Sequence, residues 1–228
     1  MILQLAGAAV AAGTAAHGAF HRNSGVFGRV VRRLPTDANE IALTFDDGPN
    51  PYATPLILDA LAASQTRATF FFLGRHAERW PELVRRAAVE GHQIGNHGFF
   101  HRKLHFRSAE YVRDDLTRGK RAIEAAGGGT PAFFRAPHGF RSPWVTSIAR
   151  SLGEQTVGWS LGVWDSDRPG ADAIAERATR QVRAGDILLL HDGDGYDPVG
   201  DRLQTAKALP MIIDALTLRG YSFSLLPR

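Results

Sequence analysis

Short apolar runs alternate with longer amphipathic segments along the chain from residue 40 onward. Short runs rich in Ile, Val, Phe and Leu are typical of buried strands. The predicted strands are residues 41–45, 68–73, 92–96, 132–135, 155–161, 187–190 and 221–225. The segments between them have helical periodicity, and the predicted helices are residues 54–63, 78–90, 108–126, 142–152, 171–184 and 202–218.

Residues that favour helix ends support these boundaries. Ser108 is a suitable N-cap for the longest predicted helix, and the glycines at 127–129 end it. Gly91 ends the helix at 78–90, and Pro143 is expected at the first position of the helix at 142–152.

Alternation of strands and helices predicts a mainly parallel sheet with helices outside it. About seven strand–helix units follow one another with no internal repeat and no linker. The predicted fold is therefore a single α/β domain over residues 38–228, built as a distorted (β/α)7-type barrel. Barrels of this kind place their chemistry at the carboxyl ends of the strands.

Residues 1–37 form a separate N-terminal segment. Residues 1–20 contain no Asp, Glu, Lys or Arg, and four arginines follow at 22, 29, 32 and 33. This pattern is compatible with a weak membrane anchor or an export signal. However, it lacks the basic start of a signal peptide, and its Gly, Thr, Gln and His content makes a poor spanning helix. A start site assigned too far into the gene would give the same pattern.

The amino-acid composition excludes several classes of functional site. The absence of cysteine excludes disulfides, thiolate metal sites and a cysteine nucleophile, so a metal would need His, Asp or Glu ligands. The net charge of +4 mildly favours anionic surfaces or acidic polymers, although ordinary solubility charge explains it as well. No basic run is interleaved with aromatic residues, so nucleic-acid binding is not expected. The sequence does not indicate an oligomeric state.

Polar residues follow five of the predicted strands, at the edge where the chemistry is expected. They are Asp46, Asp47, Asn96, His97, Arg135, Asp165, His191 and Asp192. Each could cap a helix, but five strand ends that deliver acids, histidines and an arginine to one rim favour an active site.

Histidine pairs with helical spacing are weak evidence by themselves. The chain has three, His17/His21, His97/His101 and His101/His105, and only the second begins at the end of a strand. We therefore select His97 and His101, keep His105 as a less favoured ligand, and interpret His17/His21 as incidental.

Adjacent carboxylates at 46 and 47 are a stronger signal. Neighbouring residues point in different directions, so one carboxylate can bind a cation while the other faces a substrate. Two like charges repel each other unless a metal or an arginine lies nearby. The alternative is a helix N-cap in a loop shaped by Pro49 and Pro51.

These motifs resemble those of the polysaccharide deacetylases, the NodB-homology group of carbohydrate esterases (family four). The similar segments are Thr-Phe-Asp-Asp-Gly-Pro at 44–49, His-Gly-Phe-Phe-His at 97–101, Arg-Ala-Pro-His-Gly at 135–139 and Leu-Leu-Leu-His at 188–191. They occur in the family's order and at about its spacing, from about residue 38 to 226. Arg202 and Thr205 resemble a closing Arg-x-x-Thr helix.

The chain departs from the family pattern in three places. Gly98 replaces a hydroxyl residue, which removes a side-chain hydrogen bond near the metal loop, and His138 replaces a tyrosine. If position 138 acts through its backbone N–H, the second change can be tolerated. The fourth motif is degraded: Asp165 is the better match to its second aspartate, with Asp167 as a competitor.

The resemblance implies a metal held by Asp47, His97 and His101, with Asp46 as general base and Arg135 holding Asp46 in place. His191 would protonate the departing amine, and Asp165 would favour the protonated form of His191. Zinc is the first choice for the metal, and Co²⁺, Fe²⁺, Mn²⁺ or Ni²⁺ also suit such ligands.

The implied substrate is an N-acetylated amino-sugar polymer or oligomer, such as peptidoglycan or chitin, which would lose acetate. The aromatic residues that follow the rim strands and could stack on sugar rings are Phe140, Trp144, Trp159, Trp164 and Tyr196. The alternatives are a deacylase or deformylase of a lipid-linked sugar, an O-acetyl esterase, or a carbohydrate-binding protein with a dead site. The expected location is a bacterial cell envelope, with membrane association through residues 1–20, although a cytoplasmic location is also compatible.

Overall fold

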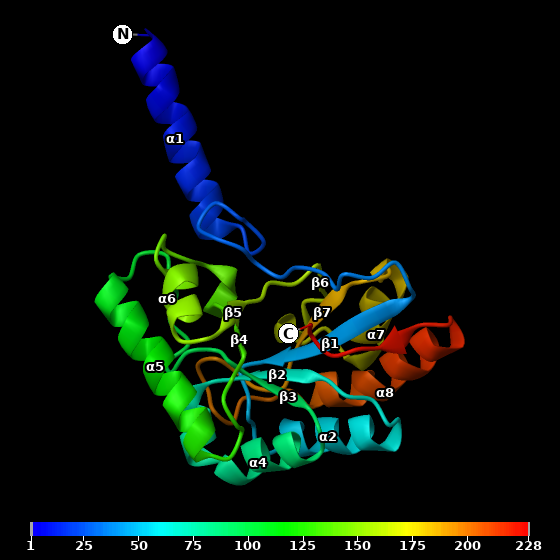
Figure 1. Ribbon diagram of the computed structural model, residues 1–228. Helices are drawn as coiled ribbons and strands as arrows, with labels where there is room; N and C mark the ends of the chain where they lie inside the picture. The colour runs from blue at the N-terminus through cyan, green and yellow to red at the C-terminus, as the bar shows by residue number, and fades with distance from the viewer. Residues whose placement is uncertain (1, 228) are drawn as a thin grey trace.

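Parallel strands form the centre of the molecule (Figure 1). A computed structural model describes the backbone of residues 2–227 and the side chains from residue 9 onward. The strands are β1 (Glu40–Asp46), β2 (Thr69–Phe72), β3 (Gln93–Asn96), β4 (Phe133–Phe134), β5 (Gln155–Thr156), β6 (Leu161–Gly162), β7 (Ile187–His191) and β8 (Ser222–Phe223). Their order is β5-β4-β3-β2-β1-β7-β6, with β8 also paired to β1, and every ladder is parallel.

Helices cover the outside of this sheet (Figure 1). They are α1 (Ile2–Phe20), α2 (Ala53–Ala63), α3 (Gly74–Arg79), α4 (Pro81–Val89), α5 (Ala109–Ala125), α6 (Val145–Ser151), α7 (Ala171–Gln181) and α8 (Leu203–Leu218), with two short 3-10 turns, Pro137–Gly139 and Asp165–Asp167. Ser108 caps α5 as predicted, because its Oγ accepts a hydrogen bond from the Tyr111 backbone N–H at 3.2 Å.

The sheet curves into a half-barrel, which is the distorted (β/α) barrel that the alternation predicts. Its edge strands are β5 and β6, and no ladder joins them among the described residues. The strand register sets the position of the site, since Asp46 on β1 is the partner of His191 on β7, and Asn96 on β3 is the partner of Phe134 on β4. The strand ends therefore meet at one rim, where Asp47, His97 and Arg135 follow directly.

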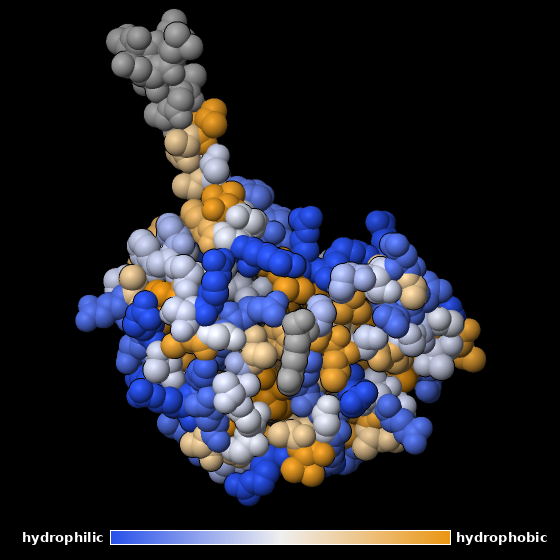
Figure 2. Space-filling model, in the orientation of Figure 1, coloured by the Kyte–Doolittle hydropathy of each residue, from blue (hydrophilic) through white to orange (hydrophobic). Residues whose placement is uncertain are grey.

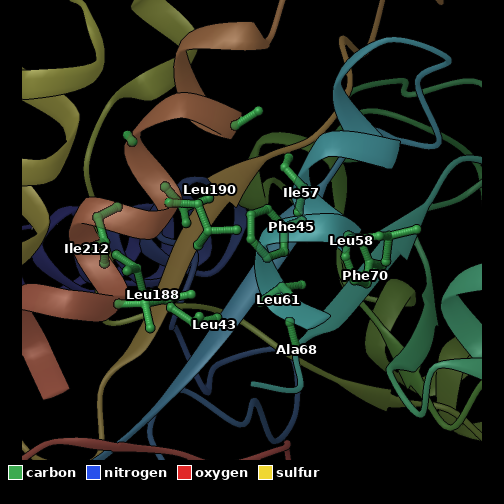
Figure 3. Packing of buried hydrophobic residues seen from close by; sticks show 14 of the residues in the cluster. Leu43, Phe45, Ile57, Leu58, Leu61, Ala68, Phe70, Leu188, Leu190 and Ile212 are labelled. Carbon is green, nitrogen blue, oxygen red and sulfur yellow. The ribbon is translucent and has the colours of Figure 1, made fainter. Parts of the chain in front are cut away.

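A hydrophobic core between the sheet and helices α2 and α8 holds the central strands in place (Figure 3). It includes Phe45 of β1, Leu190 of β7, Ile57 of α2 and Ile212 of α8, and these four side chains are fully buried. Full burial of such a side chain stabilises the fold by about 1.5–3 kcal/mol. The rigid centre of the sheet thus supports the strand ends that carry the polar rim.

Three predicted helices differ from those observed, and one of them, expected at 171–184, ends at Gln181. The helix expected at 78–90 is two helices, α3 and α4, because the chain leaves helical geometry at Trp80 and restarts at Pro81. Proline has no N–H to continue the first helix, but it suits the first turn of the second. The helix expected from residue 142 begins only at Val145, so Pro143 is not at its first position.

The strand expected at 155–161 is also split, into β5 and β6. Between them Val157 forms a bridge with Val31, and the backbone of Trp159 bonds to the side chain of Asn23. The N-terminal segment thus takes the place of a continuous strand. Its helix α1 points away from the domain (Figure 1), and the coloured part of this projection is mostly apolar or weakly polar (Figure 2). No helix among the described residues is long and apolar enough to span a bilayer.

Candidate active site

Asp46 ends β1 and is held by Arg135. The Arg135 Nη1 atom lies 2.7 Å from Asp46 Oδ1, and the arginine is fully buried. The same guanidinium donates to Thr44 Oγ1 at 2.9 Å and to the Gly158 carbonyl at 2.9 Å. These three acceptors fix the arginine, so the carboxylate of Asp46 has one defined orientation.

Asp47, His97 and His101 form a buried triad beside Asp46. The Nε2 atoms of His97 and His101 lie 3.2 and 3.1 Å from Asp47 Oδ1. Their potential ligand atoms all lie within 4.8 Å of one another. The other ring nitrogen of His97, Nδ1, lies 2.8 Å from the Arg135 carbonyl. An Nδ1–H that donates to this carbonyl leaves Nε2 free to bind a metal.

The triad has the properties of a divalent metal site. Asp47 Oδ1 is buried and has no hydrogen-bond donor among the described residues, although two imidazoles face it. Burial works to raise the pKa of Asp47, but His101 and His97 hold it well below its ordinary value. Two imidazole nitrogens and one ionised carboxylate suit zinc and similar cations, and three protein ligands leave positions open for a substrate.

His76 of α3 supports the triad from behind, which the sequence analysis missed. Its Nδ1 atom lies 2.8 Å from the Asp47 carbonyl oxygen. Burial lowers the pKa of His76 to about 4, so the ring is neutral and its Nδ1–H can donate to that carbonyl. The contact fixes the backbone of Asp47, which has the unusual φ of 74°. No local signal separates His76 from other helix histidines, because its partner lies on another element.

His191 and Asp165 form a hydrogen-bonded pair on the other side of Asp46. His191 Nδ1 lies 2.8 Å from Asp165 Oδ1, and Thr205 Oγ1 donates to Asp165 Oδ2 at 2.8 Å. Burial alone would lower the pKa of His191, but the charge of Asp165 and its hydrogen bond outweigh burial and raise it to about 9. The structure therefore places Asp165, and not the exposed Asp167, beside His191.

Asp192 also follows β7, but it packs against the loop that carries Asp47 and Gly48 and does not line the cavity. Its Oδ2 atom accepts a hydrogen bond from Thr54 Oγ1 at 2.5 Å. Gly48 packs against it so closely that a Cβ there would lie 2.0 Å from Asp192 Oδ2. Burial, with the nearby charges of Asp47 and Asp46, raises the pKa of Asp192 to about 7. Asp192 thus supports the loop that carries Asp47.

The glycine at position 98 has a local structural explanation, and His138 contacts another residue of the cavity. Gly98 has a φ of 80°, and a Cβ there would lie 2.4 Å from Asp115 Oδ2. The Asp115 carboxylate accepts hydrogen bonds from the next two backbone N–H groups, Phe99 at 3.1 Å and Phe100 at 3.2 Å. His138 has a φ of 58°, and its Nε2 atom lies 2.9 Å from the Tyr196 hydroxyl.

A cavity of about 520 Å³ opens over these groups. The residues proposed to act in catalysis or metal binding that line it are Asp46, Asp47, His97, His101, Asp165 and His191. Of the aromatic residues considered for sugar stacking, Phe140, Trp159, Trp164 and Tyr196 line the cavity. Trp144 does not line it, and its indole N–H donates to the Arg107 carbonyl at 3.0 Å.

The remaining histidines lie outside the triad. His105 packs in an aromatic cluster with Phe20, Phe106 and Phe140 and does not join the metal site. His17 and His21 stack on each other at 4.8 Å between ring centroids. The interpretation of this pair as incidental is incomplete, because His21 lines the cavity.

A buried Asp–His–His triad at the rim of a (β/α) half-barrel, flanked by Asp46 and His191, defines a hydrolase with a site that could hold a metal. The chain belongs to the polysaccharide deacetylase family, whose model matches residues 33–157. The resemblance stated from the motifs is thus confirmed.

Curated relatives cover most of the chain and most of their own length. A chitooligosaccharide deacetylase of Sinorhizobium fredii is 39% identical over 88% of this chain and 96% of its own. A peptidoglycan-N-acetylglucosamine deacetylase of Bacillus cereus is 38% identical over 86% of this chain and 90% of its own.

Solved structures of the same family have the same fold. A peptidoglycan N-acetylglucosamine deacetylase in complex with a 4-naphthalen-1-yl-N-oxidanyl-benzamide superposes with a TM-score of 0.81 at 33% identity, covering 87% of this chain and 91% of that one. A family 4 carbohydrate esterase from Streptomyces lividans in complex with acetate gives 0.73 at 30% identity, covering 81% and 91%. A family 4 pseudoenzyme from Bacillus anthracis gives 0.77 at 26% identity, covering 85% of this chain and 66% of that one.

Proposed function

We propose that this protein removes N-acetyl groups from an amino-sugar polymer or oligosaccharide and releases acetate. The observation that carries this proposal is the arrangement of Asp46 and His191. They are register partners on neighbouring strands, and both line the cavity that contains the triad. A base and an acid on the two sides of one metal site suit hydrolysis of an amide.

Asp47, His97 and His101 would hold the metal. A divalent cation there would polarise the amide carbonyl and lower the pKa of water toward about 7. We propose zinc, because the donors are two imidazoles and a carboxylate, with Co²⁺, Fe²⁺, Mn²⁺ and Ni²⁺ as the competing ions.

Asp46 would accept a proton on its carboxylate as water adds to the carbonyl carbon. Arg135 keeps that carboxylate aimed at the cavity through the 2.7 Å contact. The C–N bond then breaks, and His191 would give the proton on Nε2 to the departing nitrogen. Asp165 occupies the Nδ1 side of the ring, so the Nε2 side is left for the substrate.

Turnover and metal content can be tested separately. We expect the purified protein to release acetate from N-acetylated chitin oligosaccharides or peptidoglycan fragments, and to stop when a chelator is added. Asp46→Asn should lower turnover by about 10²–10⁴-fold while the protein still binds metal. A variant with both His97→Ala and His101→Ala should lose the metal.

A matched control is Asp167→Asn, since Asp167 is an exposed carboxylate next to the site. Full activity in Asp46→Asn would show that the base is another group. Metal that survives loss of both histidines would show that the ligand set is wrong. An inactive protein that still binds the oligosaccharide would favour the carbohydrate-binding alternative, which a family 4 pseudoenzyme among the similar structures keeps relevant. Lipid-linked formylated sugars and acetylxylan in the same panel test the two alternative reactions.

We also propose that the enzyme acts in a bacterial cell envelope. A relative that is named as a peptidoglycan-N-acetylglucosamine deacetylase supports this location. Residues 9–17 of helix α1 are exposed, and together with the arginines that follow the helix they favour association with an anionic membrane surface. The full chain should co-sediment with vesicles of anionic lipid, whereas a variant lacking residues 1–16 should stay in the supernatant. Equal sedimentation of both proteins would contradict the membrane role.

A further inference from the structure

The end of α1 and the segment that follows it form one wall of the catalytic cavity. Phe20, His21 and Arg22 line the same cavity as Asp46 and His191. These residues lie outside the part of the chain that matches the family model, which begins at residue 33. The wall is therefore a feature that the family motifs do not explain.

Arg141 anchors this wall to the domain. It is buried to 1% exposure, its backbone N–H donates to the Ala19 carbonyl at 3.0 Å, and its Nη2 atom donates to the carbonyls of His21 at 3.1 Å and Ser24 at 3.0 Å. A buried guanidinium that binds several carbonyls of one segment holds that segment in a single position.

Glycines on the domain allow the close approach. A Cβ at Gly139 would lie 2.6 Å from the Arg22 Cβ, and a Cβ at Gly158 would lie 2.2 Å from the Asn23 side-chain oxygen. Asn23 also donates to the Trp159 carbonyl at 2.8 Å. The wall is thus fitted against the domain on both sides of Arg22.

Arg22 differs from Arg202, which also lines the cavity, and from Arg135, which holds Asp46. Arg135 has Asp46 at 2.7 Å and Arg202 has Asp194 at 2.8 Å, so both are paired with carboxylates. Within the described residues Arg22 donates through Nε alone, to the Trp159 carbonyl at 3.1 Å, and its guanidinium lies 5.2 Å from the centroid of the Trp159 ring. No carboxylate lies within ion-pair distance of Arg22 in the described part of the chain.

We propose that Arg22 is a specificity-determining residue that binds a carboxylate carried by the sugar chain close to the acetamide. The tryptophan ring and the Nε hydrogen bond orient the guanidinium, which leaves its two terminal nitrogens for a bidentate contact. This inference rests on the proposed deacetylation, because it assumes that a sugar chain occupies the cavity. The carboxylate belongs to a lactyl ether substituent or to a uronic acid ring.

The test compares one ligand in two charge states. A tetrasaccharide of N-acetylglucosamine and N-acetylmuramic acid is used with free carboxylates and with the same groups converted to methyl amides. An N-acetylated oligosaccharide that contains a uronic acid is the second source of carboxylate. Binding is measured by calorimetry on the Asp46→Asn background, so that the ligand is not consumed, and kcat and KM are measured on the wild-type background.

We expect one or both carboxylate ligands to bind about tenfold more tightly than the amidated ligand, and the tighter of the two identifies the source. Arg22→Gln should remove that preference while the affinity for the amidated ligand changes less than about twofold. In turnover the loss should fall on KM, with kcat unchanged. Arg32→Gln is the matched control, because Arg32 is an exposed arginine of the same segment outside the cavity, and it should keep the preference.

Equal affinity of the wild-type residue 22 background for the free and the amidated ligands would overturn the proposal. A preference for the carboxylate ligands that survives Arg22→Gln would also overturn it. An equal loss of affinity for both ligands would show that Arg22 only supports Trp159. Failure of the proposed function is distinguishable, because the wild-type protein would then turn over none of the ligands. The binding measurement would still show separately whether Arg22 gives a preference for the carboxylate.

Discussion

His191 Nδ1 lies 2.8 Å from Asp165 Oδ1, and both residues line the cavity. The pair raises the pKa of His191 to about 9, so the imidazole is protonated below that pH and loses its proton above it. If His191 is the general acid, activity is therefore present at neutral pH and declines as the pH rises through about 9. A metal bound at the triad adds positive charge nearby and would move this decline to lower pH.

Asp165→Asn should move the alkaline decline of kcat toward lower pH by at least about one unit. The reason is that the amide removes the charge that favours the protonated ring. The measurement is the pH profile of kcat between about pH 6 and 10. Asp167→Asn should leave the profile in place, and an unmoved profile in Asp165→Asn would mean that another group is the acid.

Arg135→Met should destabilise the protein by about 3–5 kcal/mol, because it leaves the buried carboxylate of Asp46 without its partner. The double variant Arg135→Met with Asp46→Asn should regain part of that loss, since it removes the unpaired charge. Denaturant unfolding of the four proteins completes the cycle. If the two single substitutions change the free energy of unfolding additively, Arg135 and Asp46 do not stabilise the fold as a coupled pair.

Gly195→Ala should weaken metal binding by about tenfold, because the loop after β7 packs directly on His101. A Cβ at Gly195 would lie 2.0 Å from His101 Nδ1, so the ring or the loop must move. Metal competition with a chelating dye measures the change. Gly25→Ala is the control, because no atom lies within 4 Å of a Cβ at that glycine. Unchanged affinity in Gly195→Ala would contradict the prediction that packing of this loop positions the His101 ring for metal binding.

Glu154→Gln should stabilise the protein at neutral and mildly alkaline pH. Burial raises the pKa of Glu154 from 4.5 to about 8, while the hydrogen bond from Asn96 lowers it. The folded state therefore holds a proton that the unfolded state releases, and the stability of the wild type falls as the pH rises between these values. Thermal unfolding should show a gain for the variant at pH 8 that shrinks toward pH 5. A constant difference across that range would show that Glu154 is not protonated in the folded state.

Much of the fold was predictable because its signals are local. The apolar strands at 41–45 and 187–190 are short enough to be distinguished from helices, and the parallel character of the sheet follows from the alternation. The predicted strand boundaries were wrong where contacts with a distant segment of the chain set them. The strand expected at 155–161 is interrupted because Val31 and Asn23 bind between its halves, and no residue near 157 signals that contact.

The candidate site was also predictable only in part, for the same reason. Asp46, Asp47, His97 and His101 follow strand ends in recognisable motifs, so the sequence indicates them. The choice between Asp165 and Asp167 depends on the path of a short 3-10 turn, and the structure places only Asp165 at His191. His76 and Arg22 reach the site through tertiary packing from α3 and from the N-terminal segment, which no pattern in their own neighbourhood predicts.

The short pairing of β8 with the start of β1 has a practical consequence. Ser222 and Phe223 pair with Glu40 and Ile41, and the Leu226 N–H donates to the Gln93 side chain at the start of β3. The carboxyl-terminal segment therefore lies at the amino ends of the strands, on the side opposite the rim that carries the cavity, whereas α1 ends beside the cavity. A fusion partner or a surface attached behind residue 228 would leave the opening free for an insoluble polymer, and the same attachment at the amino terminus would stand next to the entrance.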